Sequence, residues 1–233
     1  TGVQTCALPI YQVVQALKSG AVHHGFAKVV LVGHSIGTAM SQIEASTYSD
    51  ADGVLGTGLI HHLNMANFGM AASLAYPAVF DPKFAASGLP FGYLTTVPGA
   101  RETMFFYSPT TQSSVLAKDE ELKQTITVGE LSTIVPATLN PDTVNIHVPV
   151  ASYVGEYDFL GCGDDLPCTD ASVAANEAPY YASDACLETK VFKNTGHDLN
   201  LHITVDSVYD RAVRWLDRRI GRSTTHRPTD RCR

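Results

Sequence analysis

Residues 28–37 read KVVLVGHSIG, and this stretch decides the fold. The run KVVLV is short, apolar and rich in β-branched residues, which predicts a buried parallel strand. Gly33 breaks the run, and residues 36–47 then read as a helix rich in small residues. The stretch therefore predicts a strand, a tight turn and a helix in immediate succession.

The turn itself, Gly33-His34-Ser35-Ile36-Gly37, has the pattern G-x-S-x-G. Between a strand and a helix this pattern predicts a nucleophile elbow, whose strained backbone lifts the serine hydroxyl clear of the sheet. The helix dipole and the Ile36 amide can then stabilise an oxyanion. We expect side chains at Gly33 or Gly37 to clash with neighbouring backbone. The alternative is a glycine-rich turn whose serine only caps the helix.

A serine needs a base to remove its proton. His34 is adjacent to Ser35, but adjacent side chains diverge at a tight turn, so His34 is a poor candidate. His197 is the better candidate, because NTGHD (194–198) follows the last predicted strand and precedes the last predicted helix. The alternative reading of His197 is a capping or surface histidine.

A third group should orient the imidazole and stabilise its cation. Asp158 ends VGEYD (154–158), just beyond a predicted strand. Functional groups collect at the carboxyl ends of parallel strands, and the proposed nucleophile, base and acid each occupy such an end. Glu156, Asp164 and Asp165 compete with Asp158 for the acid role. Strand alternation points Glu156 away, and the other two lie further into the loop.

In the rest of the chain, predicted strands alternate with predicted helices. Further strands are predicted within residues 53–60, 148–154 and 190–192, and further helices at 11–17 and 203–220. This alternation predicts an α/β fold with a parallel sheet.

The predicted core is interrupted once. Residues 11–62 and 146–220 supply its strands and helices, whereas residues 63–145 are rich in proline and contain two aromatic clusters. A structureless loop of that length is uncommon in a compact domain. We therefore interpret residues 63–145 as an inserted helical cap.

On these residues the chain resembles the α/β-hydrolase superfamily over residues 11–220. The resemblance rests on the GHSIG elbow, the cap insertion, the VGEYD turn and the TGHD turn. The chain resembles the serine-hydrolase branch of the superfamily, because its nucleophile position holds Ser35. Dehalogenases and epoxide hydrolases of this fold have aspartate at that position. The chain order Ser, Asp, His is also that of the superfamily. The resemblance implies hydrolysis of a carboxylic ester or related acyl bond through an acyl-enzyme, without a cofactor.

The start of the chain departs from that pattern. The superfamily has several strands before the elbow, and the loop after its third strand supplies a second oxyanion amide, but only about 17 residues separate Tyr11 from Lys28. We therefore expect an N-terminally truncated fragment with an exposed apolar edge, insoluble or inactive on its own. Residues 1–10, TGVQTCALPI, resemble a translated sequencing adapter. Residues 221–233 read as a disordered basic tail.

Cys162 and Cys168 flank a tight loop next to Asp158. We expect a disulfide between them, with Cys186 as an alternative partner and free buried thiols as the other reading. The cysteine spacing does not suit zinc, so no metal site is predicted. A disulfide implies export, so we expect an extracellular location, with a cytoplasmic one as the alternative.

Two groups of residues are candidates for the pocket. One of His61 and His62 lines the pocket mouth, or both are ordinary loop residues. The cap aromatics form either an apolar acyl pocket or the cap's own core; they are Phe91, Tyr93, Phe105, Phe106 and Tyr107.

The composition of the chain excludes some classes of binding partner. The 233 residues include 16 Lys+Arg and 23 Asp+Glu, and the net charge of −7 argues against a nucleic-acid binder. No run approaches the ~18 apolar residues of a membrane-spanning helix. We therefore expect the binding partner to be a small acyl or ester substrate. The same triad also suits a C–C hydrolase, a peptidase or a cofactor-free perhydrolase, and the same fold suits a non-catalytic ligand-binding protein.

Overall fold

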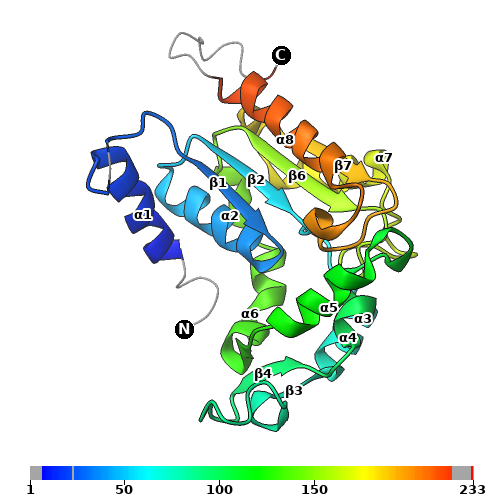
Figure 1. The fold of residues 1–233 in the computed structure, drawn as a ribbon. Coiled ribbons are helices and arrows are strands. Elements are labelled where there is room, and N and C mark those ends of the chain that lie inside the picture. Colours follow the sequence, from blue (N-terminus) through cyan, green and yellow to red (C-terminus); the bar gives the residue numbers. More distant parts are fainter. Residues whose placement is uncertain (1–6, 23, 222–231, 233) are drawn as a thin grey trace.

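The core of the protein is a parallel sheet (Figure 1). The computed structural model describes residues 7–22, 24–221 and 232. Four strands lie in the order β1-β2-β6-β7, and each neighbouring pair is parallel. They are β1 (Val30–His34), β2 (Gly53–Thr57), β6 (Val150–Gly155) and β7 (Glu188–Phe192). The predicted α/β fold with a parallel sheet is confirmed, and each strand lies within or beside its predicted run.

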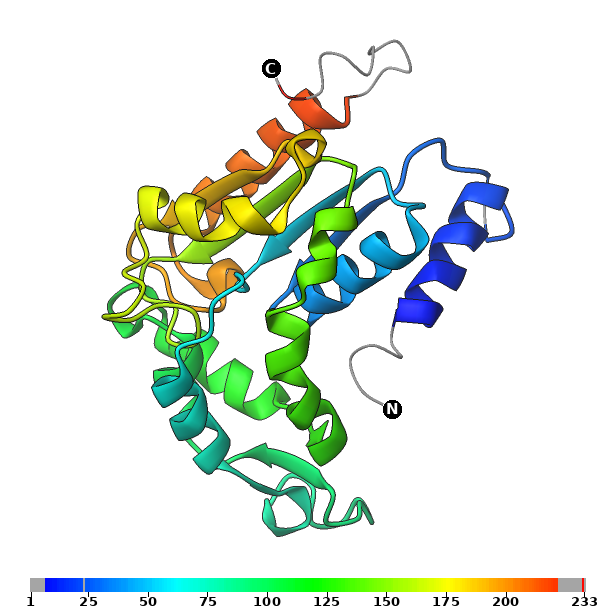
Figure 2. The same cartoon turned by 180° about the vertical axis from the view of Figure 1, so that it is seen from behind.

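Helices cover both faces of this sheet (Figure 2). On one face, Trp215 is fully buried against Leu55 and Tyr153. On the other face, Val14 packs with Leu31. The first face is covered by α8 (Val205–Arg219), and the second by α1 (Ala7–Ser19), α2 (Ile36–Tyr48) and α7 (Asp170–Glu177). Burial on both faces explains why the central strands read as continuous apolar runs.

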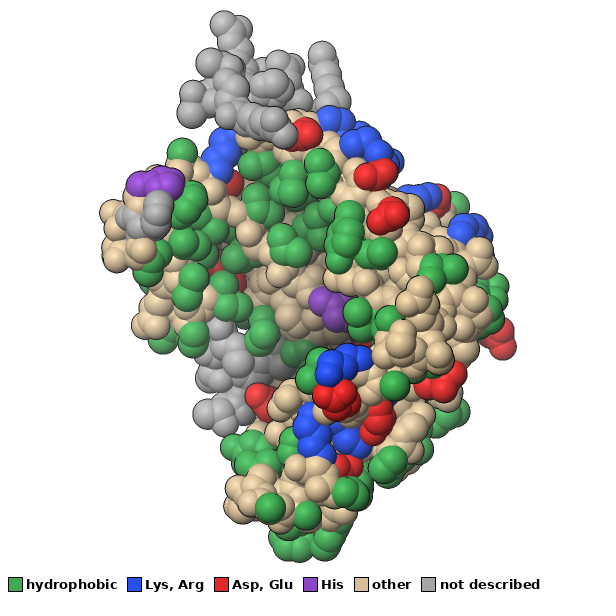
Figure 3. Space-filling model, in the orientation of Figure 1, with side chains coloured by type: hydrophobic (Ala, Val, Ile, Leu, Met, Phe, Trp, Pro, Cys, Tyr) green, Lys and Arg blue, Asp and Glu red, His purple; other side chains and the backbone are tan. Residues whose placement is uncertain are grey.

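β1 lies at the edge of the sheet. Within the described residues it pairs only with β2. Val32 on this strand is 67% exposed, whereas Val54 on β2 is fully buried. Figure 3 shows hydrophobic side chains gathered between α1 and α8 on this face. The exposed apolar edge is therefore present, while truncation and insolubility stay predictions. The adapter and tail interpretations concern residues that lie largely outside the described ones.

The insertion, residues 63–145, lies beyond the carboxyl ends of the strands (Figure 1). Its helices are α3 (Met65–Ser73), α4 (Ala100–Phe105), α5 (Ser113–Leu122) and α6 (Val128–Thr138). It also contains a small antiparallel sheet of β3 (Ala75–Pro77), β4 (Tyr93–Thr96) and β5 (Ile126–Thr127). The helical prediction did not include this sheet, because strands so short leave little alternation in the sequence.

Local capping and one buried cation order the insertion. Thr127 and Glu130 form a capping box at the start of α6. The ammonium of Lys123 is buried and lies 2.7 Å from carboxylate oxygens of both Asp81 and Glu120. This cluster ties the end of α5 to the loop before β4. None of the helices in the described ranges is long and apolar enough to cross a bilayer.

Candidate active site

Ser35 occupies a strained turn between β1 and α2. Its φ of 52° and ψ of −123° are unusual for a residue with a side chain. The Ser35 N–H donates to the carbonyl of Thr57 at 2.8 Å, which fixes the turn against β2. Ile36 is the first residue of α2, where an N–H has no carbonyl one turn earlier to bond.

The glycines of the elbow differ in their roles. A Cβ on Gly33 would lie 2.4 Å from the carbonyl oxygen of Gly37, so only glycine fits at position 33. A Cβ on Gly37 would meet nothing within 4 Å. The expected clash at Gly37 is therefore wrong, because the crowding runs in one direction: the bare Gly33 makes room for the backbone of Gly37.

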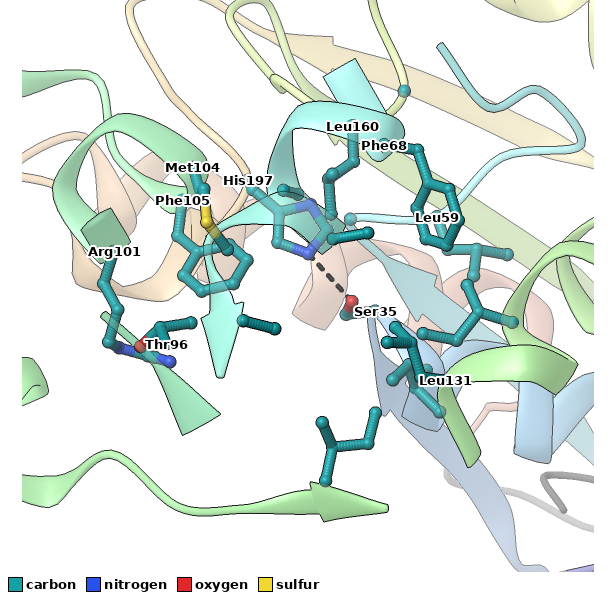
Figure 4. Close-up of a pocket in the computed structure, with 18 of the residues that line it drawn as sticks. Ser35, Leu59, Phe68, Thr96, Arg101, Met104, Phe105, Leu131, Leu160 and His197 are labelled. Carbon is teal, nitrogen blue, oxygen red and sulfur yellow. Dashed lines mark hydrogen bonds between the residues drawn. The ribbon is translucent and has the colours of Figure 1, made fainter. Parts of the chain in front are cut away.

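The structure brings Ser35, His197 and Asp158 together from three strand ends. Nε2 of His197 lies 2.8 Å from Oγ of Ser35 (Figure 4), and Nδ1 lies 2.9 Å from Oδ2 of Asp158. Asp158 is 1% exposed, and its other oxygen accepts N–H bonds from Leu160 and Gly161, both at 3.0 Å. With Nδ1 protonated, Nε2 is free to accept the serine proton.

The other acidic residues considered as partners of His197 do not contact it. Glu156 accepts from the Lys193 ammonium at 2.6 Å and from the Asn194 N–H at 3.0 Å, on the surface. Asp164 is exposed. Asp165 is exposed too and pairs with His62 at 3.1 Å. Within the described chain, Asp158 is the carboxylate bonded to His197.

Glycines allow the acid and histidine turns to touch. A Cβ on Gly155, at the end of β6, would lie 2.2 Å from the carbonyl oxygen of Gly196 and 2.3 Å from that of Thr195. Neither oxygen can move without displacing the turn that carries His197. Gly155 is therefore required for the approach of the His197 turn to the Asp158 turn.

A second carboxylate, Asp198, adds to the electrostatics of the base. Burial disfavours the imidazolium of His197, but the charge and hydrogen bond of Asp158 and the charge of Asp198 outweigh it, so the pKa of His197 is raised above 6.5. Burial works against the Asp198 carboxylate as well, but its hydrogen bond with His34 and the nearby charges lower its pKa. His34 therefore acts here as a partner of Asp198, with its Nδ1 3.0 Å from the hydroxyl of Thr57.

His202 links the histidine turn to the insertion. Its Nε2 accepts N–H bonds from Gly196 and from Tyr107, both at 3.0 Å, and its Nδ1 donates to the carbonyl of Asp198 at 2.9 Å. The Asp198 N–H in turn donates to the carbonyl of Phe105 at 2.9 Å. Burial lowers the pKa of His202, in keeping with a neutral ring that accepts at Nε2. The sequence analysis gave no role to Asp198 or His202.

A cavity of about 440 Å³ opens beside Ser35 and His197. Ser35, Asp158, His197 and Ile36 all line it. Most of its other walls come from the insertion and are apolar, including Phe68, Leu131 and Met104 (Figure 4). The volume suits a small-molecule ligand.

Some of the residues predicted to line the pocket do so, and others lie elsewhere. His62 and Phe105 line the cavity. His61 does not: it is buried, bonded to Glu177 at 2.9 Å and stacked on Tyr180. Four of the five insertion aromatics also lie outside the lining. Phe91 is 66% exposed and packs on Phe80, Phe106 is buried beside His202, and Tyr93 belongs to β4; Tyr107 stacks on Tyr157. These rings serve local packing, which composition cannot distinguish from pocket lining.

The structure pairs four cysteines. Cys162 and Cys168 form one disulfide, in the loop that follows Asp158. Cys186 pairs with Cys232 instead of acting as an alternative partner for that loop. The first bridge lies against the residues that hold the acid, since the Cys162 N–H donates to the Asp158 carbonyl at 2.9 Å.

One cluster in the described ranges has metal-ligand chemistry. His34, His197 and Asp198 offer ligand atoms within 4.8 Å of one another. Both ring nitrogens of His197 already bond to Ser35 and Asp158. The arrangement therefore suits proton transfer at His197.

Comparisons with known proteins give matches at the level of structure. No family model matches the chain, and no curated protein matches its sequence. The structure of the metagenome-derived lipolytic enzymes LipS and LipT matches with a TM-score of 0.58 and 10% identity, covering 93% of this chain and 74% of that one. A monoacylglycerol lipase of Paleococcus ferrophilus matches with a TM-score of 0.59 and 16% identity, covering 93% and 75%.

A methylesterase from Arabidopsis matches as well, with a TM-score of 0.56 and 13% identity over 93% of this chain and 78% of that one. Identities this low carry information on architecture and none on substrate. The parallel sheet, the elbow after β1 and these matches agree: the chain has the α/β-hydrolase fold.

Proposed function

We propose that the protein is a serine hydrolase that cleaves a carboxylic ester through an acyl-enzyme. One observation carries the proposal: His197 bridges Ser35 and Asp158 with hydrogen bonds of 2.8 and 2.9 Å at the wall of a cavity. This arrangement of nucleophile, base and orienting acid is the one that acyl transfer needs.

The chemistry follows from the positions of the groups. Ser35 Oγ attacks the ester carbonyl while His197 Nε2 takes its proton, and Asp158 stabilises the resulting imidazolium. The oxyanion lies at the N-terminus of α2, against the Ile36 N–H. His197 then gives the proton to the leaving alkoxide, and a water that it deprotonates releases the acyl group from Ser35.

A fluorophosphonate probe tests the proposal, because it labels only an activated serine. We expect a single adduct on Ser35, absent from Ser35→Ala and slowed at least ~10³-fold in His197→Ala. The experiment is done on this chain and on any longer protein that contains it, since the exposed edge of β1 favours aggregation. An adduct that persists in Ser35→Ala refutes the proposal.

We also propose an oxidising, extracellular location. Two disulfides support it, because such bridges persist mainly outside the cytosol. Mass analysis of the native protein under thiol-blocking conditions tests it. Free Cys162 and Cys168 in the protein from its own cells would contradict it.

A further inference from the structure

The loop that follows Asp158 turns consecutive N–H groups toward it. The N–H groups of Leu160 and Gly161 donate to Oδ1 of Asp158, both at 3.0 Å. The N–H of Cys162 donates to the Asp158 carbonyl at 2.9 Å. Because Asp158 is buried, the direction of these peptide groups decides where its carboxylate lies.

The carbonyl sides of the same peptide groups are bonded to the first residues of the insertion and the residue before it. The pairs are the Phe159 carbonyl with Nδ2 of Asn67 at 2.7 Å, the Leu160 carbonyl with the N–H of Asn64 at 2.8 Å, and the Gly161 carbonyl with Nδ1 of His62 at 3.0 Å. Each of these carbonyls shares its peptide group with the N–H of the next residue, which bonds to Asp158. A peptide group bonded at both ends cannot turn without losing one of the two bonds. The segment 62–67 therefore fixes the direction of the donors that hold Asp158.

The side chain of Asn64 makes a second contact with this loop. Its Oδ1 accepts from the Asn67 N–H at 3.0 Å and so caps α3, while its Nδ2 donates to the Cys162 carbonyl at 3.2 Å. Gly163 leaves room for the amide, because a Cβ at that position would collide with Nδ2 of Asn64. The two ends of one amide thus join the start of α3 to the loop that follows Asp158.

Neither asparagine lines the cavity, although both neighbour residues that do. Figure 4 shows Phe68, from α3, and Leu160, from the loop, on the cavity wall. Asn64 and Asn67 are partly buried and bond to backbone. An influence of the asparagines on ligand binding would pass through the wall that α3 forms, whereas an influence on the reaction itself would pass through Asp158.

We propose that Asn64 and Asn67 are positioning residues for Asp158 and, through it, for His197. They hold the peptide groups whose N–H donors fix the carboxylate, so that Oδ2 stays 2.9 Å from Nδ1 of the imidazole. Their part in catalysis rests on the proposed function, but their effect on the imidazole does not. The start of the insertion then supports the acid as well as the cavity.

Asn67→Leu tests the inference, because leucine is similar in shape and favours a helix but cannot donate to the Phe159 carbonyl. With p-nitrophenyl butyrate we expect kcat to fall at least ~5-fold and KM to change less than ~2-fold, as loss of one hydrogen bond allows. Burial lowers the pKa of His197, and the charge and hydrogen bond of Asp158 raise it, so a loosened carboxylate should lower that pKa. NMR titration of the His197 ring measures this without substrate.

Asn64→Ser is the second variant. Serine caps a helix about as well as asparagine, but it lacks the donor to the Cys162 carbonyl. We expect kcat and the pKa of His197 to fall here too. Ser73→Ala is the matched control, because it removes a hydrogen bond to the Met70 carbonyl at the other end of α3. It should leave both quantities unchanged.

Three results would overturn the inference. They are an unchanged pKa of His197 in both asparagine variants, a loss of activity confined to KM, and an equal loss in Ser73→Ala, which would trace the effect to the stability of α3. Asn67→Gln, which keeps an amide donor, should regain part of the lost kcat. Failure of the fluorophosphonate probe to label Ser35 in the unaltered protein refutes only the proposed hydrolase, because the titration of His197 needs no turnover.

Discussion

Oδ1 of Asp198 lies 2.8 Å from Nε2 of His34, so a second carboxylate–imidazole pair stands beside the pair of Asp158 and His197. The rings of His34 and His197 are 5.0 Å apart, centre to centre. Asp198 follows the base directly in sequence, and His34 directly precedes the nucleophile. His197 therefore lies in the field of two carboxylates, Asp158 bonded to it and Asp198 bonded to His34.

Asp198→Asn should move the acidic limb of activity to lower pH. The Asp198 charge helps to raise the pKa of His197, so its removal lowers that pKa and leaves the imidazole neutral in more acidic solution. The rate of fluorophosphonate labelling of Ser35 as a function of pH measures this. Asp210→Asn, on the exposed face of α8, should leave the profile in place. An unmoved limb in Asp198→Asn would show that Asp158 alone sets the pKa.

Asp158→Asn should lower kcat by roughly 10³–10⁴-fold, because the amide cannot stabilise the imidazolium and favours the wrong tautomer. Glu156→Gln is the matched control, since Glu156 bonds to Lys193 and Asn194 on the surface. We expect it to change kcat by less than ~3-fold, as surface ion pairs contribute little. If Glu156→Gln were the more damaging change, the acid assignment would be wrong.

Gly33→Ala and Gly37→Ala should differ sharply. A methyl group at position 33 would lie 2.4 Å from the Gly37 carbonyl, so the elbow must distort, and we expect loss of Ser35 labelling. At position 37, in the first turn of α2, the methyl has open space, so we expect Gly37→Ala to keep Ser35 labelling and to change stability by less than ~1 kcal/mol. Thermal unfolding together with labelling distinguishes the two variants. Equal damage at both positions would contradict the one-directional crowding.

Removal of the Cys162–Cys168 bridge should affect activity more than its stability effect implies. The loop it closes is short, so the chain-entropy estimate of its stabilisation is only ~2 kcal/mol. The bridge anchors Cys162, which directly follows Leu160 and Gly161, the two residues whose N–H groups hold Asp158. We therefore expect Cys162→Ala/Cys168→Ala to lower kcat measurably while the protein is still folded.

The second bridge provides the control for that experiment. Neither Cys186 nor Cys232 lines the cavity. Cys186→Ala/Cys232→Ala should reduce the midpoint of thermal unfolding and leave kcat of the folded protein unchanged. An equal loss of kcat in both double variants would contradict a specific effect of the Cys162–Cys168 bridge on Asp158.

Glu44→Gln should stabilise the protein, and more so at higher pH. Glu44 on α2 is fully buried, and its carboxylate oxygens have no partner in the described chain. Burial, and then the nearby Asp50, raise its pKa from 4.5 to about 8. The folded state thus holds a proton that the unfolded state releases. Its contribution is fully present below pH 4.5 and declines as the pH rises toward 8.

Urea unfolding at pH 5 and pH 8.5 measures this effect. The gap in unfolding free energy between Glu44→Gln and the unaltered protein should widen between these values, by an amount on the order of a few kcal/mol. Glu121→Gln, an exposed substitution on α5, should show no such widening. A constant gap for Glu44→Gln would mean that Glu44 is ionised in the folded state.

The features predicted well from the sequence are the local ones. The apolar run before Gly33 marks β1, and the G-x-S-x-G pattern marks a turn that only a few backbone conformations satisfy. The proximity of His197 and Asp158 to Ser35 follows from one topological rule, the convergence of parallel strand ends. Each of these inferences needs only a short window and one general constraint.

The features that the sequence does not predict depend on contacts between distant segments. His61 and His62 are neighbours in sequence, yet one bonds to Glu177 in the core and the other lines the cavity. Nothing in the sequence around Thr96 or Arg101 indicates that both line the cavity, because the packing of α4 on α5 and of β4 on β3 places them. The pairing of His34 with Asp198 likewise spans most of the chain.

His202 has a further consequence for how a ligand reaches Ser35. One ring nitrogen receives N–H bonds from the histidine turn and from the insertion, and the Phe105 carbonyl receives another from Asp198. Outward movement of the insertion on this side would have to break these hydrogen bonds or displace His197 from Ser35. We therefore expect any opening of the cavity to occur away from residues 105–107.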